Sequence, residues 1–343
     1  MDTPQEPSSL TFTLLHLLAD GEFHSGEVLA QHLGISRASV SNALRGLESY
    51  GLKLYSVRGR GYCLKHPPQW LNAQRIAEYM GDRANKFLVE ILDAANSSNS
   101  LLMQQSKQDV ANGGKPGGSV LAVEWQSSGR GRLGRTWHSG LGSALTFSLL
   151  WRFDCGLSAL SGLSLAVGVG LIRALHALGI EGVQLKWPND VLGEKGKLAG
   201  ILIEAQGDML GPSAVVIGIG LNLFLQDNVL RKIDQQVTSL ADILGEVSRV
   251  PERNRLLATI LLELDGILCE FAKHGFAALR AEWQSYHGFQ DRPVRLLLPD
   301  GNSVSGIVRG VANDGALELE TMQELVKFNV GEVSLRGIDH VAS

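Results

Sequence analysis

In the stretch "SSGRGRLGRTWHSG", residues 127–140, Gly129, Gly131 and Gly134 have the spacing of a dinucleotide-binding loop. Such a loop needs a strand that runs into the first glycine and a helix that begins at the third, so that the helix N-terminus faces the phosphates. Here the next ordered segment, "SALTFSLL", alternates like a strand. The region about 20 residues further on, "LLWRF", supplies no acidic partner for a ribose. The pattern therefore excludes a Rossmann fold.

The same loop has the composition of an anion clamp. Arg130, Arg132 and Arg135 are interleaved with the glycines. Arginine grips carboxylates and phosphates at two points, and glycine lets the backbone approach a ligand and keeps the loop mobile. We interpret the loop as a mobile clamp for a small polyanion between two strands. The alternatives are a solvated basic loop or a nucleic-acid-binding Arg-Gly segment.

A second constellation is "KWPNDVLGEKGKLAGILIE". Lys186 and Asp190 flank a Trp-Pro turn, and Lys197 opens an apolar strand. A lysine at the head of a buried strand is costly unless an anion pairs with it. Either a bound anionic ligand or an ion pair with Glu194 or Glu204 would fulfil this need.

A third constellation is "VIGIGLNL", in which Gly218 and Gly220 precede Asn222. Glycine in a strand interior often marks a site where a ligand approaches closely. We expect the absent side chains to leave room for a ligand beside the sheet.

The N-terminal segment predicts a winged helix-turn-helix. "SGEVLAQHLG", opened by Ser25, and "SRASVSNALRGLESYGL", opened by Ser36, read as two helices joined at Gly34. "KLYSVRGRGYCL" reads as two strands around a glycine-rich tip, which would form the wing. This plan favours DNA binding.

Charge supports that interpretation. Between residues 36 and 60, five cationic side chains face the single acid Glu48, on a chain whose net charge is −4. A local basic patch suits phosphate contacts, although a solvated helical domain used for dimerisation is the alternative. The candidate DNA-binding residues are Ser36, Arg37, Ser39, Ser41, Asn42, Arg45, Arg58 and Arg60.

Composition bounds the rest. The chain has 343 residues, 44% of them hydrophobic, which predicts a large buried core. Cys63, Cys155 and Cys269 lie far apart and predict ordinary thiols rather than a metal site. The N-terminus lacks the pattern of a signal peptide, and no apolar run approaches about 18 residues. We therefore expect a cytoplasmic protein without a membrane segment.

The chain divides into three domains, and the predicted fold class is multidomain α+β. Residues 1–66 form the winged helix-turn-helix domain, and 67–77, with a proline pair, form a linker. Residues 78–286 alternate helical and strand patterns and predict a central mixed-sheet α/β domain. Residues 287–343 contain short β runs between turns and predict a small SH3-like β-barrel.

Within the central domain, helices are expected over 158–179 and within 252–285. Strands are expected in "SVLAVEW", "SALTFSLLWRF", "VQLKW", "KLAGILIEAQ" and "AVVIGIGLNL".

In this order, "GRGRLGR", "KWPND" and "KLAGILIE" resemble the bifunctional biotin–protein ligases that also repress the biotin operon. The resemblance extends over nearly the whole chain, from the winged helix to the terminal "GALELE" and "GEVSLR". It implies a seven-stranded, class II synthetase-like sheet in the central domain. It also implies a two-step reaction. Biotin and Mg²⁺-ATP give biotinyl-5′-adenylate and pyrophosphate, and the acyl group then passes to one lysine of the biotin carboxyl carrier protein of acetyl-CoA carboxylase.

The resemblance further implies operator DNA of biotin-synthesis genes as a partner, with the adenylate as corepressor of a homodimer. It implies no tightly bound redox cofactor and no membrane contact. Three alternatives stay open. They are a transcription factor that senses a small molecule without ligase activity, a ligase with a vestigial DNA-binding domain, and a lipoyl or octanoyl ligase.

Position by position, the resemblance assigns site residues. The biotin-binding group is Ser97, Ser98, Asn99, Gln126, Arg130, Gly131, Arg132 and Lys197. The ATP-binding group is Arg132, Arg135, Trp137, Asn222 and Arg336. The catalytic group is Lys197, Arg132, Lys186 and Asp190, of which Asp190 would help to hold Mg²⁺ or accept the proton of the attacking lysine.

The chain departs from the family pattern at three places. Ser98 replaces the commoner threonine and keeps the hydroxyl, whereas Leu133 stands where some relatives have arginine and removes a charge from the clamp. No aromatic residue follows Phe224 up to residue 240, where some relatives have a tryptophan, near Val237, that stacks on adenine.

Overall fold

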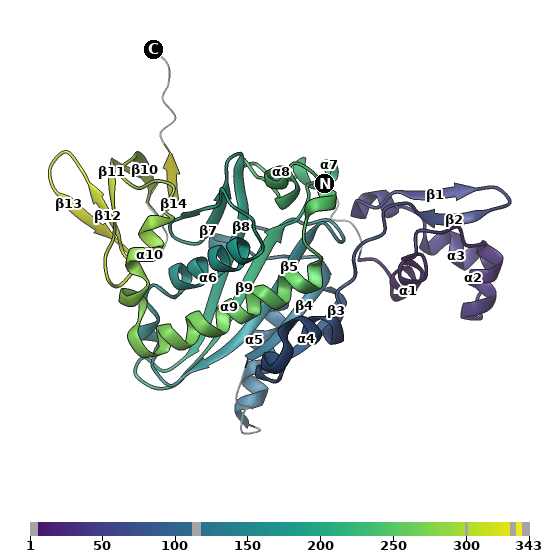
Figure 1. Ribbon diagram of the computed structural model, residues 1–343, viewed down its shortest axis with the longest axis horizontal. Helices are drawn as coiled ribbons and strands as arrows, with labels where there is room; N and C mark the ends of the chain where they lie inside the picture. Colours follow the sequence, from purple (N-terminus) through teal and green to yellow (C-terminus); the bar gives the residue numbers. More distant parts are fainter. Residues whose placement is uncertain (1–5, 112–117, 299–300, 330–333, 338–343) are drawn as a thin grey trace, which may run out of the picture.

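The computed structural model describes residues 6–111, 118–298, 301–329 and 334–337. The three predicted parts follow one another along the long axis, with the helix-turn-helix domain at one end and the C-terminal β domain at the other (Figure 1). The predicted multidomain α+β class is confirmed. Over the described residues, no helix is both long and apolar enough to span a membrane.

The N-terminal domain has the predicted helices and wing. They are α1 Ser9–Leu17, α2 Gly26–Leu33, α3 Arg37–Ala43, β1 Leu54–Val57 and β2 Gly61–Leu64. The predicted N-caps are confirmed, since Ser25 Oγ accepts the amide of Glu27 and Ser36 Oγ accepts that of Ser39. The last predicted helix is shorter than expected. The helix α3 ends at Ala43, and Gly46, with a left-handed φ of 79°, separates it from a 3-10 helix, η1 Leu47–Tyr50.

The predicted linker, residues 67–77, is wrong in its second half. Residues Ala73–Met80 form helix α4, capped by Asn72, whose side chain accepts the amide of Arg75. Ile76 and Met80 are buried on the side of α4 that packs against the central domain. Only residues 67–72 therefore connect the domains as an extended segment.

The central domain is built on a seven-stranded mixed sheet of order β3-β4-β5-β9-β8-β7-β6, as the resemblance implied. Only β3 and β4 pair in parallel among the described strands. The bounds are β3 Phe87–Ala95, β4 Gly118–Gln126, β5 Ala144–Phe153, β6 Gln184–Lys186, β7 Asp190–Gly193, β8 Gly196–Gly207 and β9 Ser213–Asn222. The edge strand β3 was missed by sequence analysis.

Side-chain alternation gives the sheet two different faces. Odd-numbered residues such as Leu145, Phe147 and Ile217 face the long helices α6 Leu163–Ala177 and α9 Arg253–His274. Leu150 and Val216 face helix α5, on the opposite side (Figure 1). Helix α5, Ser98–Ala111, covers only part of its face, and the functional pocket opens beside its N-terminus.

Shorter helices complete the central domain. They are α7 Asp227–Leu230, α8 Leu240–Leu244 and α10 Arg280–Ser285, with 3-10 helices η2 Gly81–Lys86, η4 Leu157–Leu160, η5 Val247–Arg249 and η6 Phe276–Ala278.

The helix-turn-helix domain is docked onto the central domain at both ends of the glycine-arginine loop. The Tyr50 ring packs edge-on against Trp125, which precedes the loop, at a centroid distance of 5.9 Å. After the loop, the amide of Leu141 donates to Tyr50 O at 3.1 Å. Gln226 Nε2 donates to Gly51 O at 3.0 Å. The segment after α3 thus contacts residues on both sides of the glycine-arginine loop.

The C-terminal domain is a five-stranded antiparallel sheet of order β13-β12-β11-β10-β14. Its strands are β10 Pro293–Leu297, β11 Ser303–Val311, β12 Leu317–Glu320, β13 Leu325–Phe328 and β14 Ser334–Gly337, matching the predicted β runs. Trp187 of the central domain is 1% exposed, and its Nε1 donates to Gly315 O at 3.1 Å. This contact ties the "KWPND" turn to the C-terminal sheet.

A buried histidine at this junction predicts acid sensitivity. His287 is 6% exposed, and its ring stacks on Trp283 at 4.5 Å. Burial lowers the pKa of His287 from its ordinary 6.5 to about 4. His287 binds a proton more readily in the unfolded chain than in the folded one. Its neutral, buried form therefore contributes its full stability above pH 6.5, and this contribution is lost as the pH falls toward 4. We expect wild type to lose about 2 kcal/mol more unfolding free energy than His287→Phe between pH 7 and pH 5.

Urea unfolding at both pH values measures this difference. Phenylalanine keeps the aromatic ring but cannot take up a proton. Equal pH dependence in the two proteins would contradict the assignment of the acid sensitivity to His287.

Candidate active site

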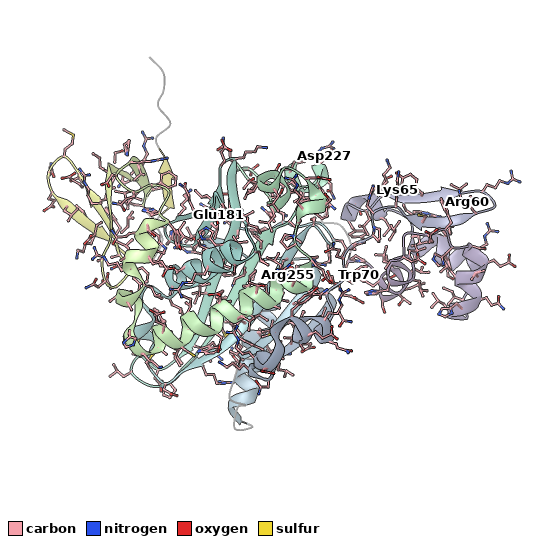
Figure 2. All side chains as sticks on the ribbon, in the orientation of Figure 1. Arg60, Lys65, Trp70, Glu181, Asp227 and Arg255 are labelled. Carbon is pink, nitrogen blue, oxygen red and sulfur yellow. The ribbon has the colours of Figure 1, made fainter. Side chains whose placement is uncertain are left out.

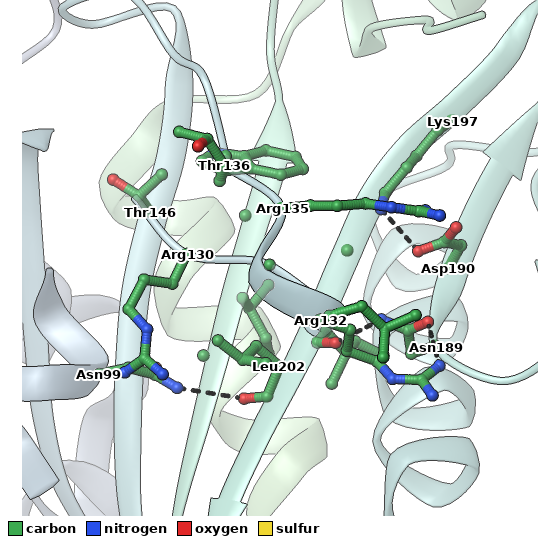
Figure 3. Close-up of a pocket in the computed structure, with 18 of the residues that line it drawn as sticks. Asn99, Arg130, Arg132, Arg135, Thr136, Thr146, Asn189, Asp190, Lys197 and Leu202 are labelled. Carbon is green, nitrogen blue, oxygen red and sulfur yellow. Dashed lines mark hydrogen bonds and ion pairs between the residues drawn. The ribbon is translucent and has the colours of Figure 1, made fainter. Parts of the chain in front are cut away.

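One pocket gathers most of the predicted site residues. It opens where the sheet ends of β5, β8 and β9 meet the N-terminus of α5 and the glycine-arginine loop (Figure 3). The predicted residues that line it are Ser97, Ser98, Asn99, Gln126, Arg130, Gly131, Arg132, Arg135, Trp137, Lys186, Asp190 and Lys197.

The glycine-arginine loop forms a narrow hairpin over this pocket. The amide of Gly131 donates to Arg135 O at 2.7 Å, and that of Trp137 donates to Gly129 O at 2.8 Å. A Cβ on Gly129 would lie 2.5 Å from Trp137 O, so this close approach requires glycine. The tip is the 3-10 turn η3, Arg132–Gly134, in which Leu133 has a left-handed φ of 56°. Strand β5 follows the loop, as predicted, so in the described chain no helix begins at the third glycine.

One end of the pocket is cationic. Lys197 Nζ lies 2.7 Å from Asp190 Oδ1, and its ammonium is 5.9 Å from the centre of the Trp137 ring. Arg132 donates to Asn189 Oδ1 at 3.2 Å, which places its guanidinium beside the same turn (Figure 3). Burial lowers the pKa of Arg132, and Asp190 opposes that shift. Arg132 of the glycine-arginine loop and Lys197 of strand β8 thus both lie near the carboxylate of Asp190.

The lysine that opens β8 has a different partner from those considered in the sequence. Its ion pair is with Asp190 rather than with Glu194 or Glu204. Strands β7 and β8 are antiparallel neighbours, and Asp190 of β7 lies opposite Gly200 of β8. Lys197 is on the same strand as Gly200, so its side chain can reach Asp190 on the neighbouring strand. Lys186 lies on the far side of the turn, with its ammonium 5.8 Å from the Phe289 ring.

The other end of the pocket is polar and nearly neutral. The amide of Ser98 donates to Gln126 Oε1 at 2.9 Å. Ser148 Oγ donates to Asn99 Oδ1 at 2.5 Å. The predicted "SSN" segment and Gln126 are therefore joined in one hydrogen-bonded cradle, although they come from different elements.

The glycines of β9, Gly218 and Gly220, line the main pocket, as expected from sequence, and they also make room for two side chains of the site. A Cβ on Gly218 would lie 2.2 Å from Asn99 Oδ1, and one on Gly220 would lie 2.4 Å from Cε2 of Trp137. Part of the room that these glycines create is taken by the side chains of Asn99 and Trp137. Their role is to seat the cradle and the aromatic wall against the sheet.

A second pocket adjoins the first and continues past Trp137. Asn222 lines it, and its Nδ2 donates to Thr238 O at 3.0 Å. His138, Lys232 and Asp234 are further lining residues that sequence analysis did not single out. Val237, at the place of the missing aromatic residue, lines it as well. The backbone of Arg336 lies in β14, but its side chain is outside the described residues.

In the described part of the chain, no group of three or more His, Cys, Asp or Glu side chains could hold a metal ion. Asp190 is the acidic side chain that lines the main pocket. Mg²⁺ is commonly held by one or two carboxylates together with substrate phosphates. A Mg²⁺ ion that arrives with ATP would find one carboxylate in the main pocket, that of Asp190.

The candidate DNA-binding residues lie on α3, directly before and after it, and on the wing, at the end of the molecule away from the C-terminal domain (Figure 1). Arg60 is on the wing (Figure 2), with its guanidinium 4.2 Å from the centre of the Phe23 ring. Arg45 donates to Asn42 Oδ1 at 3.0 Å, and both are exposed. The hydroxyls of Ser36 and Ser39 are hydrogen-bonded to each other at the N-cap.

Comparison with known protein families defines the class. Residues 98–222 match the Biotin/lipoate A/B protein ligase family, and residues 291–336 match the Biotin protein ligase C terminal domain. Residues 11–63 match an HTH domain. The solved biotin protein ligase from Aquifex aeolicus in complex with biotin and ATP is similar in structure. Its TM-score is 0.60 at 25% identity, over 73% of this chain and 99% of that one.

Full-length relatives define the family more narrowly. The Bifunctional ligase/repressor BirA of Salmonella typhimurium is 36% identical, and that of Escherichia coli 35%, each over 97% of this chain and 99% of the relative. The Biotin–[acetyl-CoA-carboxylase] ligase of Mycobacterium tuberculosis is 32% identical over 71% of this chain. The chain belongs to the family of bifunctional ligase/repressor proteins, and it joins a biotin-ligase enzyme domain to a helix-turn-helix domain.

Proposed function

We propose that the protein joins biotin to ATP as biotinyl-5′-adenylate and transfers the biotinyl group to a lysine of the biotin carboxyl carrier protein of acetyl-CoA carboxylase. The observation that carries this proposal is the two-ended pocket. Its polar, nearly neutral cradle suits an uncharged head group, and its cationic end suits a carboxylate and a phosphate.

In the first step, the biotin carboxylate attacks the α-phosphorus of ATP, so two anionic groups must be brought together. Arg132 and Lys197 would stabilise the negative charge that accumulates there, because preorganised donors act strongly in a water-poor site. Asp190 would hold the Mg²⁺ that arrives with ATP, an ion that supplies neutralising charge for the phosphate groups when bound. On binding, Lys197 would exchange its Asp190 partner for the substrate oxygens.

In the second step, the acceptor lysine must lose a proton before it attacks the acyl carbon. Asp190 would be the acceptor of that proton once Lys197 has turned to the substrate. The mixed anhydride reacts with water, and the hairpin 128–137 closing over it would protect the intermediate. Arg135, Trp137 and Asn222 would hold the nucleotide in the adjoining pocket, with the side chain of Arg336 completing it.

The test is incubation of the protein with biotin, Mg²⁺-ATP and an acceptor domain. We expect pyrophosphate release and biotinylation of one acceptor lysine. Biotin binding without pyrophosphate release would favour the alternative of a sensor without ligase activity. Equal use of lipoic or octanoic acid would favour the lipoyl or octanoyl alternative.

A second role is supported by the exposed basic wing. The protein would bind operator DNA of biotin-synthesis genes as a homodimer loaded with the adenylate, since a two-fold dimer matches a two-fold operator. Its expected location is the cytoplasm. Gel shifts with and without biotinyl-5′-adenylate test this role, and binding that ignores both ligand and sequence would favour a vestigial domain.

The wing gives this role a specific prediction. Arg58 is exposed at the turn between β1 and β2. Replacing Arg58 by alanine should weaken binding to all sequences alike and reduce the slope of log K against log salt by about 0.9 per lost phosphate contact. Fluorescence anisotropy at several salt concentrations measures the slope. Arg83→Ala, at an exposed site of the central domain, is the control. An unchanged slope in Arg58→Ala would remove the wing from the interface.

A further inference from the structure

Glu204 of β8 does not line the pocket, yet its carboxylate contacts two residues that do. Its Oε1 lies 2.8 Å from Arg130 Nη2, and its Oε2 accepts from Arg130 Nη1 at 3.1 Å. The same Oε2 accepts from Asn99 Nδ2 at 3.1 Å. Glu204 therefore joins the hairpin 128–137 to the N-terminus of α5 from behind the cradle.

These contacts fix which way the amide of Asn99 faces. An ionised carboxylate accepts hydrogen bonds but donates none, so only the Nδ2 side of the amide can face Glu204. Nδ2 also donates to Leu202 O at 3.3 Å, which uses both of its hydrogens (Figure 3). Oδ1 accepts from the fully buried hydroxyl of Ser148 and has one lone pair left. The cradle is thereby set to accept one more N–H donor.

Glu204 also controls charge in the pocket. Arg130 carries a permanent positive charge beside the cradle, and the two-point pair with Glu204 neutralises it. Arg132 lies at the opposite, cationic end. The difference between the two ends orients a molecule that has an uncharged polar head and a carboxylate tail.

We propose that Glu204 is a positioning and specificity-determining residue. By fixing the Asn99 amide and neutralising Arg130, it makes the cradle select a head group with N–H donors, the cyclic urea of biotin. The dithiolane ring of lipoic acid and the alkyl chain of octanoic acid offer no N–H donor and would leave the buried acceptor unpaired, which is a strong basis for rejection. This inference rests on the proposed function and names the device that selects its acid substrate.

The test compares Glu204→Gln and Glu204→Ala with wild type in pyrophosphate release. Glutamine keeps the size of the side chain but adds a donor, so the Asn99 amide can turn over. We expect KM for biotin to rise about tenfold or more in both variants, with kcat and KM for ATP within about twofold of wild type. The preference for biotin over lipoic acid should fall in parallel. In an Asn99→Ala background, Glu204→Ala should raise KM for biotin much less.

The matched control is Glu320→Gln, which removes a comparable two-point pair with Arg309 in the C-terminal domain. It should leave KM for biotin unchanged. If wild type is active and both Glu204 variants have its KM for biotin and its acid preference, this inference is overturned while the proposed function stands. An equal rise of KM in the Asn99→Ala background would also overturn it, because the effect would then not pass through Asn99. A wild type that releases no pyrophosphate would contradict the proposed function and this inference together.

Discussion

Replacing Lys197 by alanine is expected to lower the rate of biotin- and ATP-dependent pyrophosphate release by about 10²- to 10³-fold. The Lys197 side chain is 18% exposed, and its ammonium is held at the cationic end of the pocket, 2.7 Å from Asp190. Its removal deletes one of the two cations that would meet the developing charge and leaves Asp190 near the attacked phosphorus. A steady-state pyrophosphate assay at saturating biotin and ATP measures the loss in kcat.

Lys195→Ala is the matched control for this prediction. Lys195 is two residues away on the turn before β8, 67% exposed, and 3.7 Å from Asp242 outside the main pocket. The two substitutions change net charge equally, so a general electrostatic effect would appear in both. A Lys197→Ala protein with the kcat of wild type would show that this ammonium does not stabilise the reaction.

Replacing Glu124 by alanine is expected to lower the free energy of unfolding more than any other substitution considered above. Arg253 and Glu124 form an ion pair at 2.6 Å in which both side chains are at most 2% exposed. Glu124 also accepts the amide of Leu71, and Arg253 donates to Ala144 O. This pair joins the extended linker to the sheet and to α9. Glu124→Ala would leave a buried guanidinium without its counter-ion, at a cost of about 3–5 kcal/mol.

Urea unfolding at pH 7 measures this cost. The double variant Glu124→Leu/Arg253→Met should recover much of the stability, because a well-packed apolar pair avoids the unpaired charge. Glu246→Ala, which removes an exposed pair with Arg249 at 4.0 Å, should change stability by less than about 1 kcal/mol. A Glu124→Ala protein as stable as Glu246→Ala would show that the buried pair does not hold the linker.

The parts of the molecule that follow strong local patterns could be predicted from sequence. Strands of alternating or uniformly apolar residues, the capped helices at Ser25 and Ser36, and the turn before Asp190 are of this kind. Strand β3 was missed because an edge strand with polar residues such as Glu90 is only partly buried. The helix in the linker was missed because its apolar face is short and is decided by packing against α9.

The site shows the same division. The site residues in the glycine-arginine loop and the "KWPND" turn could be predicted from composition, because both motifs place charged residues beside glycine or proline. The contacts of Glu204 behind the cradle could not be predicted in this way, because Glu204 lies 74 residues from Arg130 in the sequence. An acidic residue in a half-buried strand has the pattern of a solvent-facing position. The partners of Glu204, Arg130 and Asn99, become apparent only when the structure brings the loop and the N-terminus of α5 next to β8.

Formation of the adenylate intermediate can be measured without an acceptor protein. The protein would be incubated with biotin and Mg²⁺-ATP in the absence of any acceptor, and the quenched mixture analysed by mass spectrometry. We predict biotinyl-5′-adenylate in an amount close to one per chain, together with an equal amount of pyrophosphate. A protein that binds biotin and ATP but yields no adenylate would contradict the claim that Arg132 and Lys197 converge to form an acyl-phosphate bond.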